Sequence, residues 1–423
     1  MNIAFLANPT VGHTNFLISL ANKFNSMNHD ICFYIPGVNS DLLINLLDNP
    51  ALKINKKLNK NNIPYKLLPF SISQLYRGFM LSYKRGFAEV LYALKFFYSG
   101  SLKSTELLEK YFKSNKPDLI IYDYTYFPAI FISQLLNIPR VAVYHSGLPF
   151  LEFPIPPIGT NLKYGQYSLE VFDQYKKLVN KEENKIMKDF ELKYKRKLNS
   201  KLLEKPSGSV LNIVNTIIEA EYPRKDMNSY LTYCGPSIQG NSIENISKYN
   251  KDDKKIIYIS LGTVFNKQPL LFKRIIESIP VNQYRLIISS GQSYNYLKKQ
   301  FVHPDIIIEK FVNQIDILKI ASIFITHGGK NSINESIKYG VPMILFPAGG
   351  EQEYNANLIE YIKCGINFSD KIKYFGKSEM SGAINQLLNT NQMMESVRFL
   401  SAKHQIDGAE IAYNKIINAY ESN

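Results

Sequence analysis

Short apolar runs alternate regularly along this chain with longer stretches of helical periodicity. Residues 2–8 form an apolar run, and Pro9 and Gly12 follow it directly. Apolar side chains then recur at helical spacing over residues 16–24, and residues 31–35 are apolar again. This order predicts a strand, a helix and a second strand, and hence a βαβ unit whose strands are parallel.

The alternation continues through the first half of the chain and starts again in the second half. Further strands of the first half are predicted at residues 119–122, 141–144 and 210–214. Strands of the second half are predicted at residues 256–261, 285–289, 306–308, 323–326 and 342–346. A polar joint, residues 235–255, separates the halves. Because 423 residues exceed what one core usually holds, we expect an α/β fold in two domains.

Composition argues against several other classes of protein. Hydrophobic, aromatic and charged residues make up 45%, 13% and 20% of the chain, which is typical of a globular protein. No apolar run approaches the roughly 18 residues of a membrane-spanning helix, and the N-terminus is typical of a first strand rather than a signal peptide. The three cysteines show no metal-ligand spacing, so we expect structural thiols, no metal site and a cytoplasmic location.

The net charge of +14 is compatible with a nucleic-acid, membrane or acidic partner. No zinc-finger or RRM-type signature accompanies it, so we expect no nucleic-acid partner. Lys and Asn are abundant throughout the chain, which favours a compositional bias of the source genome. The densest basic stretch, residues 176–205, also contains Glu and Asp. That mixture favours a solvated helix face and leaves weak association with a membrane surface as the alternative.

The segment most informative about chemistry is residues 323–347, IFITHGGKNSINESIKYGVPMILFP. An apolar strand runs into His327 and two glycines, and a helix is predicted to begin near Asn331 and Ser332. Glycines let a ligand approach the backbone closely, and the N–H groups and positive dipole end of a helix attract an anion. The pattern predicts a phosphate site, although an ordinary turn with a capping box of Ser332 and Glu335 fits equally well.

The residues around this segment add a more specific signal. Residues 309–356 resemble the nucleotide-sugar box of family 1 UDP-glycosyltransferases, including their bacterial macrolide-glycosyltransferase branch. The positions that match this pattern in register are Gln314, His327, Gly329, Asn331, Ser332, Glu335, Gly340, Pro342, Pro347, Gln352, Asn355 and Ala356. The resemblance extends to residues 260–263 (SLGT) and 9–13 (PTVGH). It therefore covers essentially the whole chain, and it is weakest over residues 39–116 and 148–205.

The resemblance implies a GT-B architecture, in which two Rossmann-like domains face each other across a cleft. The N-terminal domain, expected at residues 1–235, would bind the acceptor. After a linker at residues 236–255, the C-terminal domain, expected at residues 256–405, would bind the nucleotide sugar. Residues 406–423 would form a helix that packs back toward the N-terminal domain. The resemblance also implies an inverting transferase that needs neither a metal ion nor a cofactor.

The same resemblance assigns donor-binding residues position by position. The assigned set is Thr263, Phe311, Val312, Gln314, His327, Gly329, Asn331, Ser332, Glu335, Glu351 and Gln352. In this set Phe311 would stack on the nucleobase and Gln314 would contact the nucleoside. His327 and Ser332 would hold the diphosphate with help from Thr263. Glu335 would bind the ribose.

Three departures from the family pattern concern the nucleobase and the sugar. Phe311 stands where the pattern prefers Trp, so stacking would involve less ring area. Asn313 replaces the usual Pro. Glu351, which with Gln352 would bind the hydroxyls of the sugar, stands where the pattern has Asp, and its extra methylene leaves the identity of the sugar open. We expect UDP-glucose as the co-substrate, with a dTDP-sugar as the alternative.

The first half of the chain must supply a general base. His13 follows the first strand and Gly12, where a loop opens at the carboxyl edge of the sheet. By the resemblance His13 is the base, and Asp123, at the end of the strand 119–122, is its partner. A carboxylate on the far ring nitrogen fixes the tautomer and stabilises the imidazolium. Asp118 is the rival, but it precedes the strand and is better suited to a turn.

The acceptor is the least constrained part of the prediction. Tyr76, Phe79, His145 and Phe150 are candidates to line its pocket. An aromatic pocket suits a lipophilic or aromatic small molecule, such as a macrolide, a flavonoid or another natural product, and a monomer or homodimer is expected. Three alternatives remain: a sugar-nucleotide epimerase on the same fold, a non-catalytic helper, and a peripheral membrane transferase acting on a lipid or lipid-linked acceptor.

Overall fold

The computed structural model describes residues 1–37, 50–69, 87–145, 147–199, 208–225, 228–238, 246–249, 252–262 and 267–422. The chain divides into two compact units. Unit 1 consists of Met1–Ile218, Tyr222–Ser237 and Ile406–Asn423, and unit 2 consists of Glu219–Glu221 and Ile238–Gln405. In this division Glu219–Glu221, far upstream of the polar joint, belongs to unit 2, and unit 2 resumes at Ile238, within the expected linker.

Unit 1 is built on a parallel sheet of seven strands in the order β3-β2-β1-β4-β5-β6-β7. The strands are β1 (Asn2–Leu6), β2 (Asp30–Gly37), β3 (Tyr65–Pro69), β4 (Leu119–Asp123), β5 (Arg140–Tyr144), β6 (Leu211–Val214) and β7 (Thr232–Tyr233). The described helices are α1 (Val11–Ser26), α3 (Pro50–Lys60), α5 (Phe87–Tyr98), α6 (Ser101–Ser114), α7 (Pro128–Leu136), α8 (Leu169–Tyr194) and α16 (Gly408–Glu421).

The strands of unit 1 are apolar on both faces because helices cover both faces of the sheet. Ala4 and Leu6 of β1 belong to one core cluster, together with residues of α6, α7 and α8. Ile3 and Phe5 belong to the other cluster, together with residues of α1, α3 and α16. This alternation explains why the strand reads as a continuous apolar run, as parallel strands buried on both sides do.

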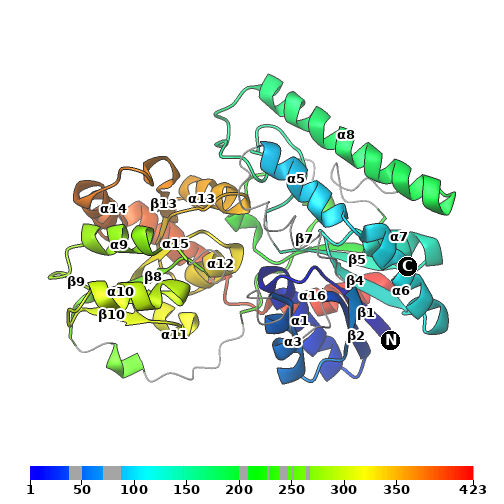
Figure 1. The fold of residues 1–423 in the computed structure, drawn as a ribbon, viewed down its shortest axis with the longest axis horizontal. Coiled ribbons are helices and arrows are strands. Elements are labelled where there is room, and N and C mark those ends of the chain that lie inside the picture. The colour runs from blue at the N-terminus through cyan, green and yellow to red at the C-terminus, as the bar shows by residue number, and fades with distance from the viewer. Residues whose placement is uncertain are drawn as a thin grey trace. The chain divides into compact units, whose positions relative to one another are not determined.

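The last helix, α16, packs beside α1 although the two are almost the whole chain apart (Figure 1). Its N-terminal end approaches the chain so closely that a Cβ atom on Gly408 would lie 1.9 Å from the carbonyl oxygen of Gly235. Lys23 of α1 and Glu410 of α16 form an ion pair on the surface of the same packing. The C-terminal segment is therefore an integral part of unit 1.

Unit 2 repeats the architecture with a parallel sheet of six strands in the order β10-β9-β8-β11-β12-β13. The strands are β8 (Lys255–Ser260), β9 (Tyr284–Ser289), β10 (Ile306–Glu309), β11 (Ala321–Thr326), β12 (Met343–Leu345) and β13 (Gly365–Asn367). The helices are α9 (Pro269–Ser278), α10 (Tyr294–Gln300), α11 (Gln314–Leu318), α12 (Lys330–Lys338), α13 (Glu351–Tyr361), α14 (Lys377–Asn389) and α15 (Asn391–Lys403).

The strand order marks one position in each sheet where a ligand is expected. In unit 1 the order runs outward in both directions from the neighbouring pair β1 and β4, and in unit 2 it does so from β8 and β11. Ligands of open α/β sheets bind outside the carboxyl ends of the strands at such a switch point. The segments that follow these four strands are therefore where functional side chains should gather.

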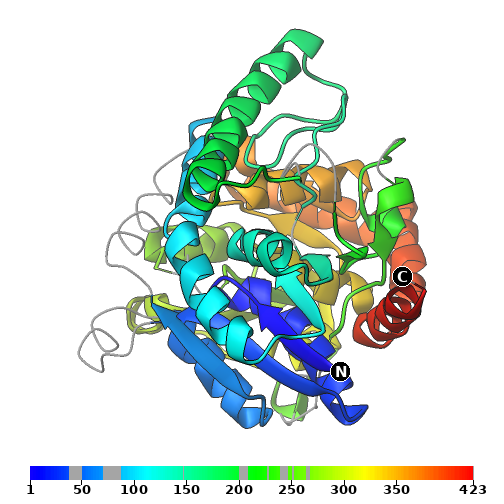
Figure 2. The ribbon, with the colours of Figure 1, turned by 90° about the vertical axis from the view of Figure 1, so that its right-hand side faces the viewer.

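Among the described residues, no helix combines the length and the hydropathy that crossing a bilayer requires. The longest of them, α8, is instead a polar-surfaced helix that runs beside α5 at the edge of unit 1 (Figures 1 and 2).

Candidate active site

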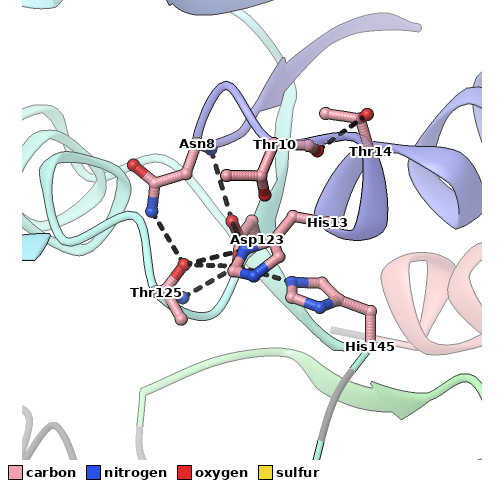
Figure 3. Close-up of polar contacts among 7 residues, drawn as sticks. All are labelled: Asn8, Thr10, His13, Thr14, Asp123, Thr125 and His145. Carbon is pink, nitrogen blue, oxygen red and sulfur yellow. Dashed lines mark hydrogen bonds and ion pairs between the residues drawn. The ribbon is translucent and has the colours of Figure 1, made fainter. Parts of the chain in front are cut away.

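In unit 1 the segments that follow β1, β4 and β5 bring three titratable side chains together (Figure 3). Asp123 is the last residue of β4, His13 lies in the first turn of α1 just after β1, and His145 follows β5 directly. The Nδ1 atom of His13 lies 2.9 Å from Oδ2 of Asp123. The Nε2 atom of His145 lies 2.7 Å from Oδ1 of the same carboxylate. The predicted pair of His13 and Asp123 is thus in hydrogen-bond contact at the switch point of the sheet.

Backbone and hydroxyl groups complete the surroundings of the Asp123 carboxylate. The backbone N–H of Thr125 donates to Oδ1 at 2.9 Å, and the Thr125 hydroxyl donates to the same oxygen at 2.8 Å. The backbone N–H of Asn8 donates to Oδ2 at 3.3 Å. The side chain of Asn8 donates to the Thr125 hydroxyl at 2.7 Å, which ties the segment after β1 to the segment after β4. The carboxylate is therefore held by donors on both oxygens.

Asp123 is fully buried, yet its surroundings favour the charged form. Burial alone would raise the pKa of this carboxyl group, but His13 and His145 beside it more than offset that effect and hold its pKa well below the usual range. An anionic Asp123 can orient the ring of His13 and stabilise that ring when it becomes charged. The side chain of His13 is 18% exposed, so the buried carboxylate acts on a histidine that solvent or a ligand reaches.

His13, Asp123 and His145 are also the one group of described residues whose ligand atoms, within 4.8 Å of one another, could hold a metal ion. The distances of 2.9 and 2.7 Å between imidazole nitrogens and carboxylate oxygens are ordinary hydrogen-bond lengths. Each imidazole addresses a different oxygen of the carboxylate. That arrangement is compatible with proton transfer.

The structure places two of the expected acceptor-pocket residues differently from the prediction. His145 is 2% exposed and its ring is directed at Asp123, so it does not present itself to a ligand. Phe150 is 3% exposed and packs in the core against Tyr144, with ring centroids 5.2 Å apart. Both follow the carboxyl end of β5, but the chain turns their side chains into the unit. Tyr76 and Phe79 lie outside the described residues.

The expected rival of Asp123 lies at the other end of its strand. Asp118 precedes β4, and its Oδ2 accepts a hydrogen bond of 2.8 Å from the backbone N–H of Asn2, where β1 begins. Asp118 therefore contacts the amino end of β1, whereas His13 lies beyond the carboxyl end of that strand.

In unit 2 the strand β11 ends in the predicted turn of His327, Gly328 and Gly329, and α12 begins at Lys330. Gly329 is the N-cap of this helix, and no side chain caps it. Ser332 is thus the third helical residue, and the predicted capping box with Glu335 is absent. A helix start without a side-chain cap leaves its first turn suited to hydrogen bonding with a ligand.

Two glycines make room for the imidazole of His327. A Cβ atom on Gly262, which follows β8 and has φ of +81°, would lie 2.5 Å from Cε1 of this ring. A Cβ atom on Gly329 would lie 2.8 Å from its Nε2. Side chains at either position would collide with the ring. Gly262 follows β8 and His327 follows β11, the two strands at the switch point of unit 2, so residues 260–262 and the glycine turn meet there.

His327 is held in its neutral form by its surroundings. Burial lowers the pKa of its imidazole to about 4. Its Nδ1 atom is buried and lacks a hydrogen-bond partner among the described residues. A neutral imidazole is suited to act as a hydrogen-bond donor rather than as a fixed positive charge.

A hydrogen-bond network links three of the predicted donor-binding residues. Nε2 of Gln314, the first residue of α11, donates to Oε2 of Glu335 at 2.6 Å and to the Ser332 hydroxyl at 3.1 Å. The hydroxyl of Tyr258 in β8 donates to Oε1 of Gln314 at 3.3 Å. Glu335 is one turn inside α12 and partly exposed, so its carboxylate is fixed in place while it remains accessible.

The other predicted donor-binding residues lie around this network in unit 2. Phe311 is 61% exposed, so its aromatic ring is accessible for stacking. Val312 beside it is partly buried. Glu351 and Gln352 open α13, and Oε1 of Gln352 accepts a hydrogen bond of 2.9 Å from the backbone N–H of Ala348. Asn331 is the second residue of α12, and Thr263 lies outside the described residues.

Sequence reasoning missed a buried ion pair next to the glycine turn. Nζ of Lys330 lies 2.9 Å from Oε1 of Glu221, and both side chains are almost entirely buried. Glu221 belongs to the three-residue segment of the first half that is part of unit 2. A basic residue at a helix start is unfavourable, which is the one local sign that Lys330 needs an acidic partner. Asn8 and Thr125 were also missed, although Thr125 follows Asp123 at the spacing of an Asx-turn.

Known proteins resemble this chain in sequence and in fold. The family model of UDP-glucoronosyl and UDP-glucosyl transferase matches residues 176–409, more than half of the chain. The NDP-glycosyltransferase YjiC of Bacillus subtilis (strain 168) is 23% identical over 421 residues, which cover 96% of this chain and 90% of that protein. A sterol 3-beta-glucosyltransferase of Leptosphaeria maculans is 26% identical over 179 residues, 40% of this chain and 12% of that protein.

The solved structures confirm the predicted GT-B architecture. The chain matches the crystal structure of CalG4, the calicheamicin glycosyltransferase, with a TM-score of 0.76. That match covers 100% of this chain and 98% of the other at 16% identity, so it concerns the fold alone. The sequence resemblance, the two parallel sheets and the family model agree: this chain belongs to the family of UDP-glucoronosyl and UDP-glucosyl transferases and is a glycosyltransferase that takes a sugar from a nucleotide sugar.

Proposed function

We propose that this enzyme is an inverting glycosyltransferase that moves a hexose, most simply glucose, from UDP to a hydroxyl group of a lipophilic or aromatic small molecule, with His13 and Asp123 as its base. The observation that carries the proposal is the 2.9 Å hydrogen bond between His13 and the buried Asp123 at the switch point of unit 1. A histidine oriented by a buried carboxylate is the arrangement that activates a hydroxyl nucleophile.

In the proposed reaction His13 takes the proton of the acceptor hydroxyl through Nε2, because its Nδ1 is bonded to Asp123. The acceptor oxygen forms its new bond to the anomeric carbon as the bond from that carbon to the diphosphate breaks. Attack opposite the leaving group inverts the anomeric centre. The negative Asp123 stabilises the imidazolium that results, and the nucleoside diphosphate leaves with the electron pair of the broken bond.

Unit 2 supplies the groups suited to the departing diphosphate. The start of α12 carries no side-chain cap, and the neutral His327 and the Ser332 hydroxyl lie beside it. Hydrogen-bond donors and a helix dipole that are already in place lower the energy of charge that develops on a leaving group. We propose that these groups stabilise the departing diphosphate without a metal ion or an organic cofactor. Undiminished turnover in excess EDTA is the expected result.

The remaining donor residues define the nucleotide and the sugar in this proposal. The exposed ring of Phe311 stacks on the uracil, and the fixed carboxylate of Glu335 accepts from the ribose hydroxyls. Glu351 and Gln352, at the start of α13, bind the hydroxyls of the hexose. Glu335→Ala is expected to weaken UDP binding in calorimetry by about tenfold or more, since a charge-assisted hydrogen bond is lost. An unchanged UDP affinity would remove Glu335 from the ribose site.

The acceptor class is proposed from what surrounds His13. The ring of Phe97 in α5 lies 6.3 Å from the ring of His13, centroid to centroid. Phe96 and Tyr126 line a small hollow next to Phe97. Asn8 and three serines line the same hollow, so the proposal of a flat or lipophilic acceptor with one hydroxyl group rests on the aromatic rings beside the base.

The experiment is a comparison of His13→Ala with the wild type in a transfer assay that uses UDP-glucose and a panel of hydroxylated aglycones. We expect the variant to lose about 100-fold or more in kcat, the usual contribution of a general base. His303→Ala, which removes an exposed histidine of unit 2, is the matched control and should transfer like wild type. Turnover of His13→Ala within a few-fold of wild type contradicts the assignment.

A second candidate function, transfer to a lipid at a membrane surface, is favoured by the outer face of α8. Lys177, Lys181, Lys185 and Lys188 follow one another at steps of three or four residues, so they lie on one face of the helix, and all four are exposed. None of them forms an ion pair with another described residue. Leu192 on the same helix is 58% exposed. Lysines with exposed leucines suit an anionic bilayer, and the sterol 3-beta-glucosyltransferase relative is named for a lipid acceptor.

Flotation with vesicles of phosphatidylcholine containing anionic phosphatidylglycerol tests this second candidate. Reversal of the four lysines to Glu should abolish flotation. The control is the same charge change spread over exposed lysines of unit 2, Lys298, Lys299, Lys363 and Lys377, which should leave flotation unchanged. If the wild type does not float, or if both sets of changes act alike, only the first candidate stands.

A further inference from the structure

The buried His145 is the residue of the site that the proposed reaction does not use. We propose that His145 is a positioning residue, which holds the Asp123 carboxylate in the one orientation that serves His13 and limits how strongly that carboxylate can pair with His13. The inference rests on the proposed function of His13 as the general base. It concerns a different side chain and adds a second imidazole to the expected pair.

The geometry shows a single carboxylate shared by two imidazoles. Nδ1 of His13 lies 2.9 Å from Oδ2 of Asp123, and Nε2 of His145 lies 2.7 Å from Oδ1. The two rings lie 4.0 Å apart between centroids, tilted by 39°. In Figure 3 they approach the carboxylate of Asp123 from separate elements, the start of α1 and the end of β5. Because the shorter contact belongs to the more buried ring, His145 is fixed and His13 is the partner that a ligand can reach.

The first consequence is orientational. Rotation of the Asp123 side chain would withdraw Oδ2 from His13, and the bond from His145 to Oδ1 opposes that rotation. Thr125 also donates to Oδ1, through its N–H and its hydroxyl, but both of those donors belong to the same turn as Asp123. His145, which follows the neighbouring strand β5, is the donor to Oδ1 from another element, whereas the backbone N–H of Asn8 after β1 donates to Oδ2. A rigid carboxylate keeps the tautomer and the ring direction of His13 correct for proton uptake.

The second consequence concerns the basicity of His13. The titratable groups that face the Asp123 carboxylate are His13 from α1 and His145 after β5. The ring centroid of Tyr124 lies 5.5 Å from that of His145. The other neighbours, Phe97 from α5, Asn8 and Thr125, do not titrate near neutrality. A donor on Oδ1 draws charge away from the carboxylate, so it weakens the stabilisation of a protonated His13. Removal of that donor should raise the pKa of His13, whether His145 is neutral or charged.

Three substitutions separate this role from mere packing. His145→Phe keeps a ring of similar size and removes the donor. His145→Gln places an amide N–H at about the reach of Nε2, and His145→Asn carries the same amide one bond short of it. We expect kcat to fall by roughly tenfold to a hundredfold in the Phe and Asn variants and to recover most of that loss in the Gln variant.

The decisive readout is the acid limb of the pH profile of kcat/KM. Transfer needs a neutral His13, and a raised pKa of His13 keeps that ring protonated to a higher pH. The limb should therefore move to higher pH by about half a unit to one unit in His145→Phe and His145→Asn, and it should return in His145→Gln. A residue that only fills space would lower activity or stability in all three variants and would leave the limb in place.

A nuclear magnetic resonance titration of the His13 ring in the same variants gives the shift without reliance on catalysis. If His13→Ala is fully active, the proposed base is wrong, yet the titration still shows whether His145 controls His13. If His13 is the base and neither the acid limb nor the titration moves in any variant, the inference about His145 is overturned. Should His145→Phe fail to fold, the Gln and Asn variants decide: equal behaviour of the two contradicts the proposal.

Discussion

At the scale of residues, the proposed chemistry of this enzyme depends on the contact between the carboxylate of Asp123 and the ring of His13. Asp123 makes no contact with solvent and holds its charge in a buried place because its donors are arranged around it. Such a group has little use in packing alone, because a buried charge is costly unless it is paired. Its position at the end of β4, next to the histidine that follows β1, is compatible with the proposed role in orienting that histidine.

The clearest residue-scale prediction concerns Asp123→Asn. The amide keeps the size of the side chain but can favour the wrong tautomer of His13, so we expect kcat to fall by about a thousandfold or more. UDP affinity should be unchanged, because the donor residues belong to unit 2. The matched control is Asp118→Asn at the opposite end of the same strand, which should retain full transfer. Initial rates and calorimetry with UDP measure both effects, and equal losses in the two variants would contradict the role of Asp123.

A second residue-scale prediction concerns stability against pH. Burial lowers the pKa of His404 and of His327 to about 4, whereas an unfolded chain has histidine pKa values near 6.5. Between about pH 4 and pH 6.5 these two histidines are protonated in the unfolded state and remain neutral in the folded state. The free energy of unfolding should therefore be level above about pH 6.5 and fall as the pH drops toward 4, by up to about 3 kcal/mol for each histidine.

Urea unfolding of the wild type at pH 7 and at pH 5 measures that loss. His404→Leu removes a titrating group that is fully buried and distant in sequence from the donor residues. The difference between the two pH values should be smaller in this variant than in the wild type. If the variant loses as much stability as the wild type, His404 is not the source of the pH dependence.

At the scale of elements, close packing at glycines fixes where helices begin. A methyl group on Gly408 would lie 1.9 Å from the Gly235 carbonyl oxygen, so Gly408→Ala must displace the start of α16 from unit 1. We expect a loss of roughly 1–3 kcal/mol in stability, as for other overpacked contacts. Gly382→Ala, in the exposed middle of α14 with nothing near the added atom, is the control and should be neutral or slightly stabilising. Thermal unfolding that ranks the two variants in the opposite order would contradict the packing of α16.

The elements themselves were largely predictable, and the exceptions have physical reasons. The apolar runs at residues 119–122 and 141–144 became β4 and β5, because strands buried on both faces must be apolar along their whole length. β3, β7 and β13 were missed: β3 reads Tyr-Lys-Leu-Leu-Pro, β7 has two residues and β13 reads Gly-Ile-Asn, and none of them produces a recognisable pattern. The start of α12 was predicted correctly within a residue or two, but its cap is Gly329, with no box of Ser332 and Glu335.

At the site, too, the sequence predicts some contacts and not others. The pair of His13 and Asp123 followed from a resemblance and from their positions after two strands. His145 was expected at the acceptor because it also follows a strand, and the sequence does not say that β5 lies next to β4. Only the order of strands in the sheet places its ring on the second oxygen of Asp123.

At the scale of the whole molecule, each of two units carries functional groups where its strand order reverses. Unit 1 gathers His13, Asp123 and His145 after β1, β4 and β5. Unit 2 gathers Gly262, His327 and the start of α12 after β8 and β11. One set suits proton removal and the other suits an anionic leaving group. This division of chemistry between two units of similar topology is consistent with membership of the glycosyltransferase family.

The most direct test of the central claim compares two acceptors in His13→Ala. An alcohol or phenol must lose its proton during transfer and needs the base, whereas an aryl thiol that is already ionised at the assay pH does not. We expect the variant to lose transfer from UDP-glucose to the hydroxyl acceptor by about 100-fold or more and to keep transfer to the thiol within a few-fold of wild type. Equal losses on both acceptors, or no loss on either, would contradict the assignment of His13 as the general base.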